Sequence, residues 1–138
     1  MTEQLLPPNP SQARAERVYA ALFRLAERHA ATDAARSRQV NPAALSPHEA
    51  VRLVAILAGG SAQYADDEPA VDTADLAAAL TLVPLVRSEL DELELSLLLI
   101  ARGRGMTWAE VAFGLGLRSA QAAQQRHDRL ATRADSLG

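Results

Sequence analysis

The feature that most constrains the fold is a long apolar segment between Asp72 and Arg102. Its aliphatic side chains recur every three or four residues, the spacing that places side chains on one face of an α-helix. They are Leu76, Leu80, Val83, Leu90, Leu93, Leu97 and Ile100. Pro84 lies inside this pattern and removes one backbone hydrogen bond, but the spacing keeps its phase. Proline therefore predicts a kink or a break near residues 81–83. The unchanged phase is compatible with a kinked but nearly continuous helix to Arg102 that turns this row of side chains toward the core.

Further aliphatic residues widen the same segment beyond one face. They are Leu82, Leu85, Val86, Leu95, Leu98 and Leu99. A helix that is apolar on two faces needs two partners, one of which is the chain's own core. We therefore predict that these six residues form the interface of a homodimer.

Composition favours helices in the rest of the chain as well. Alanine and leucine dominate the 138 residues, whereas aromatic residues make up only 4%. We predict an all-α fold of N-terminal helices followed by a C-terminal trihelical unit. The expected divisions are a flexible arm at 1–10, an N-terminal helical region at 11–83, a C-terminal region at 84–133 and a tail at 134–138.

The N-terminal region has two clear helical patterns and an acidic loop. The first helix is expected from Ser11 to about Arg36, and the second begins with Ser46 as its cap and ends at Gly59. Residues 61–72 predict a solvated loop. Four arginines lie mostly off the apolar stripe of the first helix, and three interpretations stay open for them: Arg14, Arg17, Arg24 and Arg28. They form a solvated face, a phosphate contact, or a surface complementary to the acidic middle of the chain.

Several classes of protein are disfavoured by what the sequence lacks. It has no cysteine, which removes disulfides and thiolate zinc sites. No apolar run reaches the ~18 residues of a membrane span, and the N-terminus does not resemble a signal peptide, so a cytoplasmic protein is expected. The three histidines are dispersed, and no catalytic or cofactor-binding motif occurs. We therefore expect no metal, no cofactor and no enzymatic activity.

The segment from Arg104 to Arg133 has the pattern of two helices joined by a turn. Thr107 and Glu110 have the spacing of a capping box, and Gly116 suits the left-handed residue that ends a helix. The residues expected to pack between the two helices, or to shape the turn, are Trp108, Val111, Ala112, Leu115, Gly116, Leu117, Ala123 and Leu130.

The second helix of this pair has a polar outer face of the kind that a DNA major groove admits. Glutamine pairs with adenine, arginine with guanine or phosphate, and aspartate accepts a hydrogen bond from cytosine. The expected base-reading residues are Gln121, Gln125, Asp128 and Arg129. The expected phosphate-binding residues are Arg104, Arg118, Ser119, Arg126 and Arg133. The chain carries a net charge of −3, but this segment is basic.

A family resemblance points the same way. The run Thr-Trp-x-Glu-Val-Ala-x-x-Leu-Gly-Leu, which begins at Thr107, resembles the helix-turn-helix of bacterial sigma-factor region 4 and of related small regulators of high-GC bacteria. The resemblance covers roughly residues 90–133 and implies a helix-turn-helix that binds double-stranded DNA. Ala120 stands where that group usually has arginine, and the turn at 117–119 is one residue longer. The resemblance therefore implies no particular DNA sequence.

Three functions follow as hypotheses. The first is a transcriptional regulator that binds DNA as a homodimer. The second is a helical adaptor that binds RNA polymerase or another regulator, with the acidic residues between Asp66 and Glu94 facing a basic partner or mimicking nucleic acid. The third is a nucleoid architectural protein with little base preference.

Overall fold

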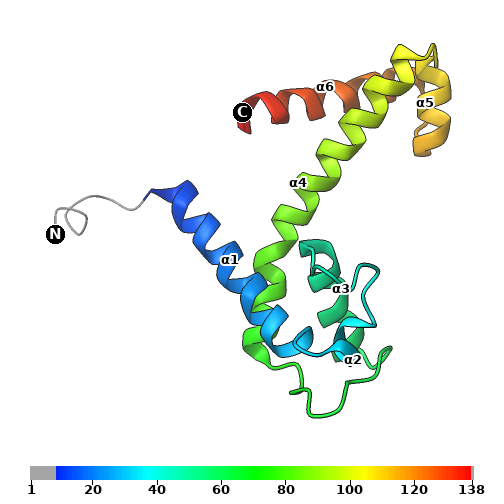
Figure 1. Cartoon of the computed structure of the whole chain (residues 1–138). Coiled ribbons are helices and arrows are strands. Elements are labelled where there is room, and N and C mark those ends of the chain that lie inside the picture. The colour runs from blue at the N-terminus through cyan, green and yellow to red at the C-terminus, as the bar shows by residue number, and fades with distance from the viewer. Residues whose placement is uncertain (1–8, 138) are drawn as a thin grey trace. The chain divides into compact units, whose positions relative to one another are not determined.

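The computed structural model describes residues 9–137, so most of the expected arm at 1–10 lies outside the described residues. The helices follow the chain in the order α1 (Pro10–His29), α2 (Asp33–Arg36), α3 (Pro47–Ala58), α4 (Thr73–Gly103), α5 (Trp108–Leu115) and α6 (Ala120–Leu137) (Figure 1). No strand occurs in residues 9–137, and the predicted all-α fold is confirmed. The chain divides into two compact units between Val86 and Arg87. None of the described helices combines the length and the hydrophobicity that crossing a membrane requires.

The ends of the N-terminal helices follow from local capping. Asn9 caps α1 by accepting hydrogen bonds from the backbone N–H groups of residues 11 and 12. The helix then ends at His29, because Thr32 starts a separate helix by accepting the N–H of Ala35 at 3.1 Å. The prediction of one helix reaching Arg36 is therefore wrong. The predicted cap of the next helix at Ser46 is confirmed, since its hydroxyl accepts the N–H three residues on.

Two further predictions concern the continuity of α4 and the end of α6. α4 runs through Pro84 without a break, so of the predicted kink or break the break does not occur. The prediction of a tail after residue 133 is wrong for residues 134–137, because α6 continues to Leu137.

The core of the first unit joins α1, α3 and the N-terminal part of α4. Its buried residues are Ala21, Leu25, Ala50, Val54, Ala78, Ala79 and Leu82. On α4 the inward positions are thus mainly alanines, which let neighbouring helices approach closely. Leu76 and Leu80, which the spacing predicted to face inward, are exposed. Leu82, predicted in a dimer interface, has no exposed surface, so that assignment is wrong; Leu85 and Val86 are half-buried.

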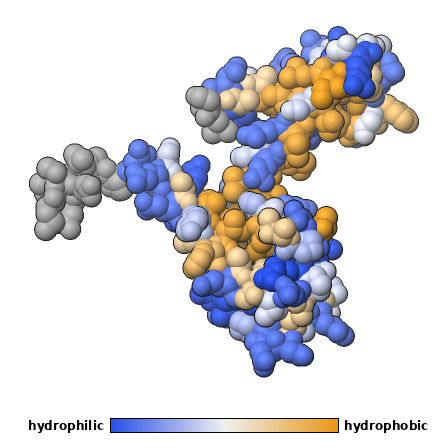
Figure 2. All heavy atoms as spheres, in the orientation of Figure 1, coloured by the Kyte–Doolittle hydropathy of each residue, from blue (hydrophilic) through white to orange (hydrophobic). Residues whose placement is uncertain are grey.

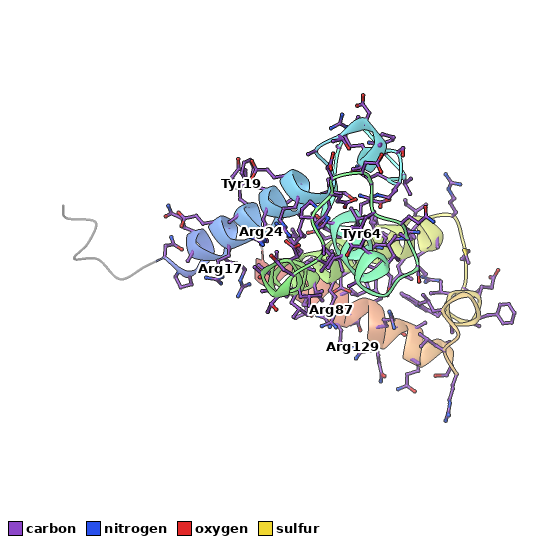
Figure 3. All side chains as sticks on the ribbon, turned by 90° about the horizontal axis from the view of Figure 1, so that it is seen from below. Arg17, Tyr19, Arg24, Tyr64, Arg87 and Arg129 are labelled. Carbon is purple, nitrogen blue, oxygen red and sulfur yellow. The ribbon has the colours of Figure 1, made fainter. Side chains whose placement is uncertain are left out.

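A buried network of ionic hydrogen bonds joins α1 to the start of α4. Asp75 is completely buried and accepts hydrogen bonds from the Nε atoms of Arg24, at 2.8 Å, and of Arg28, at 2.9 Å. Arg24, labelled in Figure 3, also donates to both carboxylate oxygens of Asp72, at 2.9 and 3.0 Å. Of the three interpretations of these arginines, the surface complementary to the acidic middle of the chain is the one observed.

His29 links Asp75 to the loop at residues 61–72. Its Nδ1 atom lies 2.7 Å from Oε2 of Glu68, and its Nε2 atom lies 3.0 Å from Oδ2 of Asp75. The buried imidazole ring therefore bridges two carboxylates. Within residues 9–137 no group of histidine and acidic side chains has the arrangement of a metal site.

Glu68 fixes the loop that the sequence predicted to be solvated. Arg38 donates to both of its carboxylate oxygens, at 2.7 and 2.9 Å, and the N–H of Ala65 donates at 2.7 Å. The Glu68 side chain is almost completely buried, so the prediction is wrong at this residue, whereas Asp66 and Asp67 are exposed. The reason is an arginine 30 positions earlier in the chain, which replaces the water around a buried carboxylate.

The first unit is expected to lose stability in acid. Burial alone would raise the pKa of Asp75, but hydrogen bonds from His29, Arg28 and their neighbours lower it to about 2. The pKa of Glu68 is also lowered, because the hydrogen bonds led by Arg38 outweigh its burial. Since an unfolded aspartate titrates near pH 3.9, the contribution of Asp75 is complete above that pH. About 2 kcal/mol is lost as the pH falls from about 4 toward 2.

Urea unfolding followed by circular dichroism between about pH 5 and pH 2 measures this loss. The Asp75→Asn variant is the matched control, because the amide does not titrate and its unfolding free energy should vary less across this range. Equal pH dependence of the two proteins would contradict the assignment.

Candidate nucleic-acid interface

The connection from α4 through α5 to α6 is shaped by local hydrogen bonds. The hydroxyl of Thr107 accepts the N–H of Glu110 at 3.1 Å, while the Glu110 carboxylate accepts the N–H of Thr107 at 3.0 Å. This is the predicted capping box. Gly116 ends α5 with a left-handed φ of 71°, a conformation that favours glycine. Ser119 then accepts the N–H of Ala122 at 3.1 Å at the start of α6.

The core of the second unit lies between the C-terminal part of α4 and the pair α5 and α6. Its buried residues are Leu98, Val111, Ala112, Ala123 and Leu130. Leu95, Ala101, Trp108 and Leu117 pack against them. Ala123 has no exposed surface, so a larger side chain there would push α6 away from its neighbours. This core sets which face of α6 is turned outward.

Three expectations about this core need correction. Leu98 is buried in it and Leu95 packs against it, so neither is free to form the predicted dimer interface. Leu115, predicted to pack between the helices, is 36% exposed, because it lies in the last turn of α5. The neighbouring Phe113 is 88% exposed and contributes nothing to the core.

The face of α6 opposite Ala123 and Leu130 is polar and exposed. It carries the predicted base-reading residues Gln121, Gln125, Asp128 and Arg129, all exposed. Their spacing of four, three and one residues keeps them within one side of the helix. Arg118 and Ser119, also exposed, precede its first turn. The structure thus brings these six residues to one end and one face of α6, where Arg129 is labelled in Figure 3.

Two arginines predicted to bind phosphate are instead bound to acidic residues of α4. Arg126 donates from Nε and Nη2 to the two carboxylate oxygens of Glu94, at 2.5 and 2.8 Å. Arg133 donates to Asp91 at 2.6 Å. The hydrogen bonds from Arg126 lower the pKa of Glu94, which keeps the pair ionised. The two ion pairs fasten α6 to α4, and the assignment of Arg126 and Arg133 to phosphate is corrected accordingly.

The sequence contains a charge pattern that matches these two ion pairs. Asp91 and Glu94 lie three residues apart on one predicted helix, and Arg126 and Arg133 lie two turns apart on another. Both pairs therefore occupy a single helix face. Opposite charges on two faces that must pack together predict ion pairs between them.

Arg102 and Trp108 form a second structural contact that the sequence analysis did not identify. The guanidinium of Arg102 lies over the Trp108 ring, 4.6 Å from its centroid, and donates to the carbonyl of Met106 at 2.7 Å. Trp108 also contacts His127, with ring centroids 5.5 Å apart. A cation that stacks on an aromatic ring holds the start of α5 against the end of α4.

The cations that remain available in this unit are few. The side chains of Arg104, Arg118 and Arg129 are exposed and have no hydrogen-bond or ion-pair partner among residues 9–137. They are three of the six arginines between Arg102 and Arg133. The net positive charge that this segment offers to a ligand is therefore smaller than its composition indicates.

The chain matches no protein-family model, no curated protein and no solved structure.

Proposed function

We propose that this chain binds double-stranded DNA through α6 and regulates transcription. The observation that carries the proposal is the exposed polar face of α6, on which amide, carboxylate and guanidinium groups follow one another at helical spacing. An α-helix of this kind fits the major groove, and these groups match the hydrogen-bonding edges of bases. In this proposal Gln121 and Gln125 pair with adenines, Arg129 pairs with guanine, and Asp128 accepts from cytosine.

The proposed phosphate contacts lie in the segments that precede α5 and α6. Within residues 9–137 the side chains of Arg104 and Arg118 have no hydrogen-bond or ion-pair partner, and the backbone N–H groups after Ser119 form the positive end of a helix dipole. Each neutralised phosphate contributes ~0.9 to the slope of log K against log salt concentration. Two such contacts, from Arg104 and Arg118, predict a slope of about −2 per chain. A slope near −4 per chain would mean that the two ion-paired arginines also leave α4 for the DNA.

Two substitutions separate base reading from phosphate binding. Gln125→Ala should lower the preference for a selected site over other DNA by about 10-fold, because one bidentate pair is lost. Arg118→Ala should weaken binding to all sequences alike and reduce the salt slope by about one. Fluorescence anisotropy with labelled genomic fragments at two salt concentrations, with unlabelled competitor DNA, measures both effects.

Gln63→Ala is the matched control, because this exposed glutamine lies in the first unit. Unchanged binding by both α6 variants would contradict the assignment of α6 to the groove. Equal affinity for all fragments would indicate the architectural role instead.

One observation favours a protein-binding adaptor as the second candidate. Phe113 is 88% exposed, and aromatic side chains are enriched at protein interfaces. The acidic middle of the chain gives weaker support than its composition suggested, because five of its nine acidic residues are already paired with arginines. These are Glu68, Asp72, Asp75, Asp91 and Glu94. Absence of DNA binding at low salt, with binding to RNA polymerase that Phe113→Ala abolishes, would favour the adaptor.

A further inference from the structure

A row of four large aliphatic side chains is exposed on the part of α4 that belongs to the second unit. They are Leu90, Leu93, Leu97 and Ile100, each more than half exposed. Hydrophobic residues are visible at the surface along this part of α4 (Figure 2). The spacing of three, four and three residues is that of alternating a and d positions in a coiled coil. The sequence pattern predicted that this row faces the chain's own core, and its exposure shows that the prediction was wrong.

The core of the second unit uses another face of the same helix. Leu98 is buried there, Leu95 packs beside it, and Glu94 binds Arg126. The exposed row is therefore left over after the unit has formed its own core. Four adjacent side chains of this size form a contiguous apolar surface, which is unusual for a face that meets only water.

We propose that this row binds the same face of α4 in a second copy of the chain, centred on Leu90 and Leu93, with the two α4 helices antiparallel. The proposal does not depend on DNA binding by α6. It keeps the homodimer expected from the sequence but assigns most of its interface to other aliphatic residues of α4. A two-fold axis then makes the surface its own complement.

The charges beside the row favour the second copy and its direction. With Leu90 opposite Leu93 of the second copy, an antiparallel pair also places Leu97 and Ile100 opposite Val86 and Val83 of the second copy. The same register brings Arg87 beside Glu94 of the second copy, and the two-fold axis repeats each contact. A parallel pair instead places Glu89 opposite Glu94 of the second copy, which brings like charges together twice. Arg87 is exposed and has no ion-pair partner among residues 9–137. The Glu94 carboxylate still has lone pairs beyond the two that Arg126 occupies.

The first test is the mass of the full chain in solution, measured by sedimentation equilibrium without DNA. The wild-type chain should have twice the mass of one chain at micromolar concentration. Leu93→Glu should raise the dimer Kd by at least about 100-fold, because it places two charges in the apolar contact. Leu99→Glu is the matched control, since Leu99 is 57% exposed on another face of α4. Its dimer Kd should change less than about 3-fold.

Two charge reversals test the direction of the helices. In an antiparallel pair, Arg87→Glu should raise the dimer Kd by about 10-fold because it creates two repulsive contacts, while Glu89→Arg should leave it unchanged. In a parallel pair, Glu89→Arg would instead lower the dimer Kd, because it turns two repulsive contacts into attractive ones.

Three results would overturn the proposal. A wild-type mass of one chain at about 100 μM would leave the row to another protein, and an unchanged dimer in Leu93→Glu would place the interface elsewhere. Tightening by Glu89→Arg would exclude the antiparallel arrangement. Circular dichroism of each variant checks that it folds; both leucines are exposed in the single chain, so folding should persist. Because DNA is absent, failure of this proposal is distinct from failure of the proposed function.

Discussion

Replacing Asp75 with alanine should lower the free energy of unfolding of the first unit by about 4 kcal/mol. The Asp75 carboxylate is fully buried and accepts hydrogen bonds from Arg24, Arg28 and His29. Its removal leaves two guanidinium groups and a buried imidazole without the carboxylate that joins them, and Asp72 and Glu68 replace it only in part. Removal of one partner from a buried ionic network costs far more free energy of unfolding than replacement of the whole network by apolar residues. Urea unfolding followed by circular dichroism at neutral pH measures the loss.

Asp66→Ala is the control for this prediction. Asp66 is an exposed acid of the same unit, so its replacement should change the unfolding free energy by less than about 0.5 kcal/mol. Hydrogen exchange should show faster amide exchange in α1 and α3 of Asp75→Ala. A loss of stability below about 1 kcal/mol would mean that the carboxylate is much better solvated than its burial indicates.

Leu82→Ala should lower the unfolding free energy by about 3 kcal/mol, whereas Leu80→Ala should change it little. Leu82 has no exposed surface and lies in the core with Leu25 and Val54, while Leu80 is 69% exposed. Alanine at position 82 leaves a cavity that the surrounding helices fill only in part. The two sites are two residues apart on one helix, so helix propensity affects both variants alike.

The same pair of variants tests which face of α4 is buried in the first unit. If Leu80→Ala were the more destabilising variant, the inward face would be the one that the apolar spacing predicted. Thermal unfolding at several protein concentrations completes the measurement. Leu82→Ala should lower the midpoint by the same amount at each concentration, because Leu82 contacts only its own chain.

Local features of this fold could be predicted because local hydrogen bonds decide them. The caps at Ser46 and Thr107 and the left-handed Gly116 depend on residues within a few positions. The end of α1 at His29 was not predicted, because the threonine that caps the next helix, Thr32, is a weaker signal of a helix boundary than a proline or a glycine. Helix existence was thus more predictable than helix length.

The buried face of α4 could not be predicted from spacing. This helix carries leucine on nearly every side, so two apolar rows competed for the same interpretation. Packing chose Ala78 and Ala79 for the core, because small residues let helices approach closely, and left Leu80 outside. Spacing rules count hydrophobic residues but not the room between helices.

The candidate interface was predictable in its uncharged part and less so in its charged part. Gln121 and Gln125 lie on the exposed face, because the helix period alone places them opposite Ala123. The role of Arg126 depended on Glu94, which is 32 positions away in the chain. A long cationic side chain reaches either solvent or a neighbouring helix, and only the packing of the helices decides between them.

The stacking of Arg102 on Trp108 gives the second unit an optical reporter of its own. Trp108 is the only tryptophan of the chain, and its two tyrosines, Tyr19 and Tyr64, belong to the first unit. Tryptophan emission excited near 295 nm therefore reports the environment between α4, α5 and His127 and is blind to the buried ionic network. A denaturation curve recorded by emission and one recorded by helical ellipticity will separate if the two units unfold independently. The two curves together therefore show, without a label or a mutation, whether the two units unfold cooperatively.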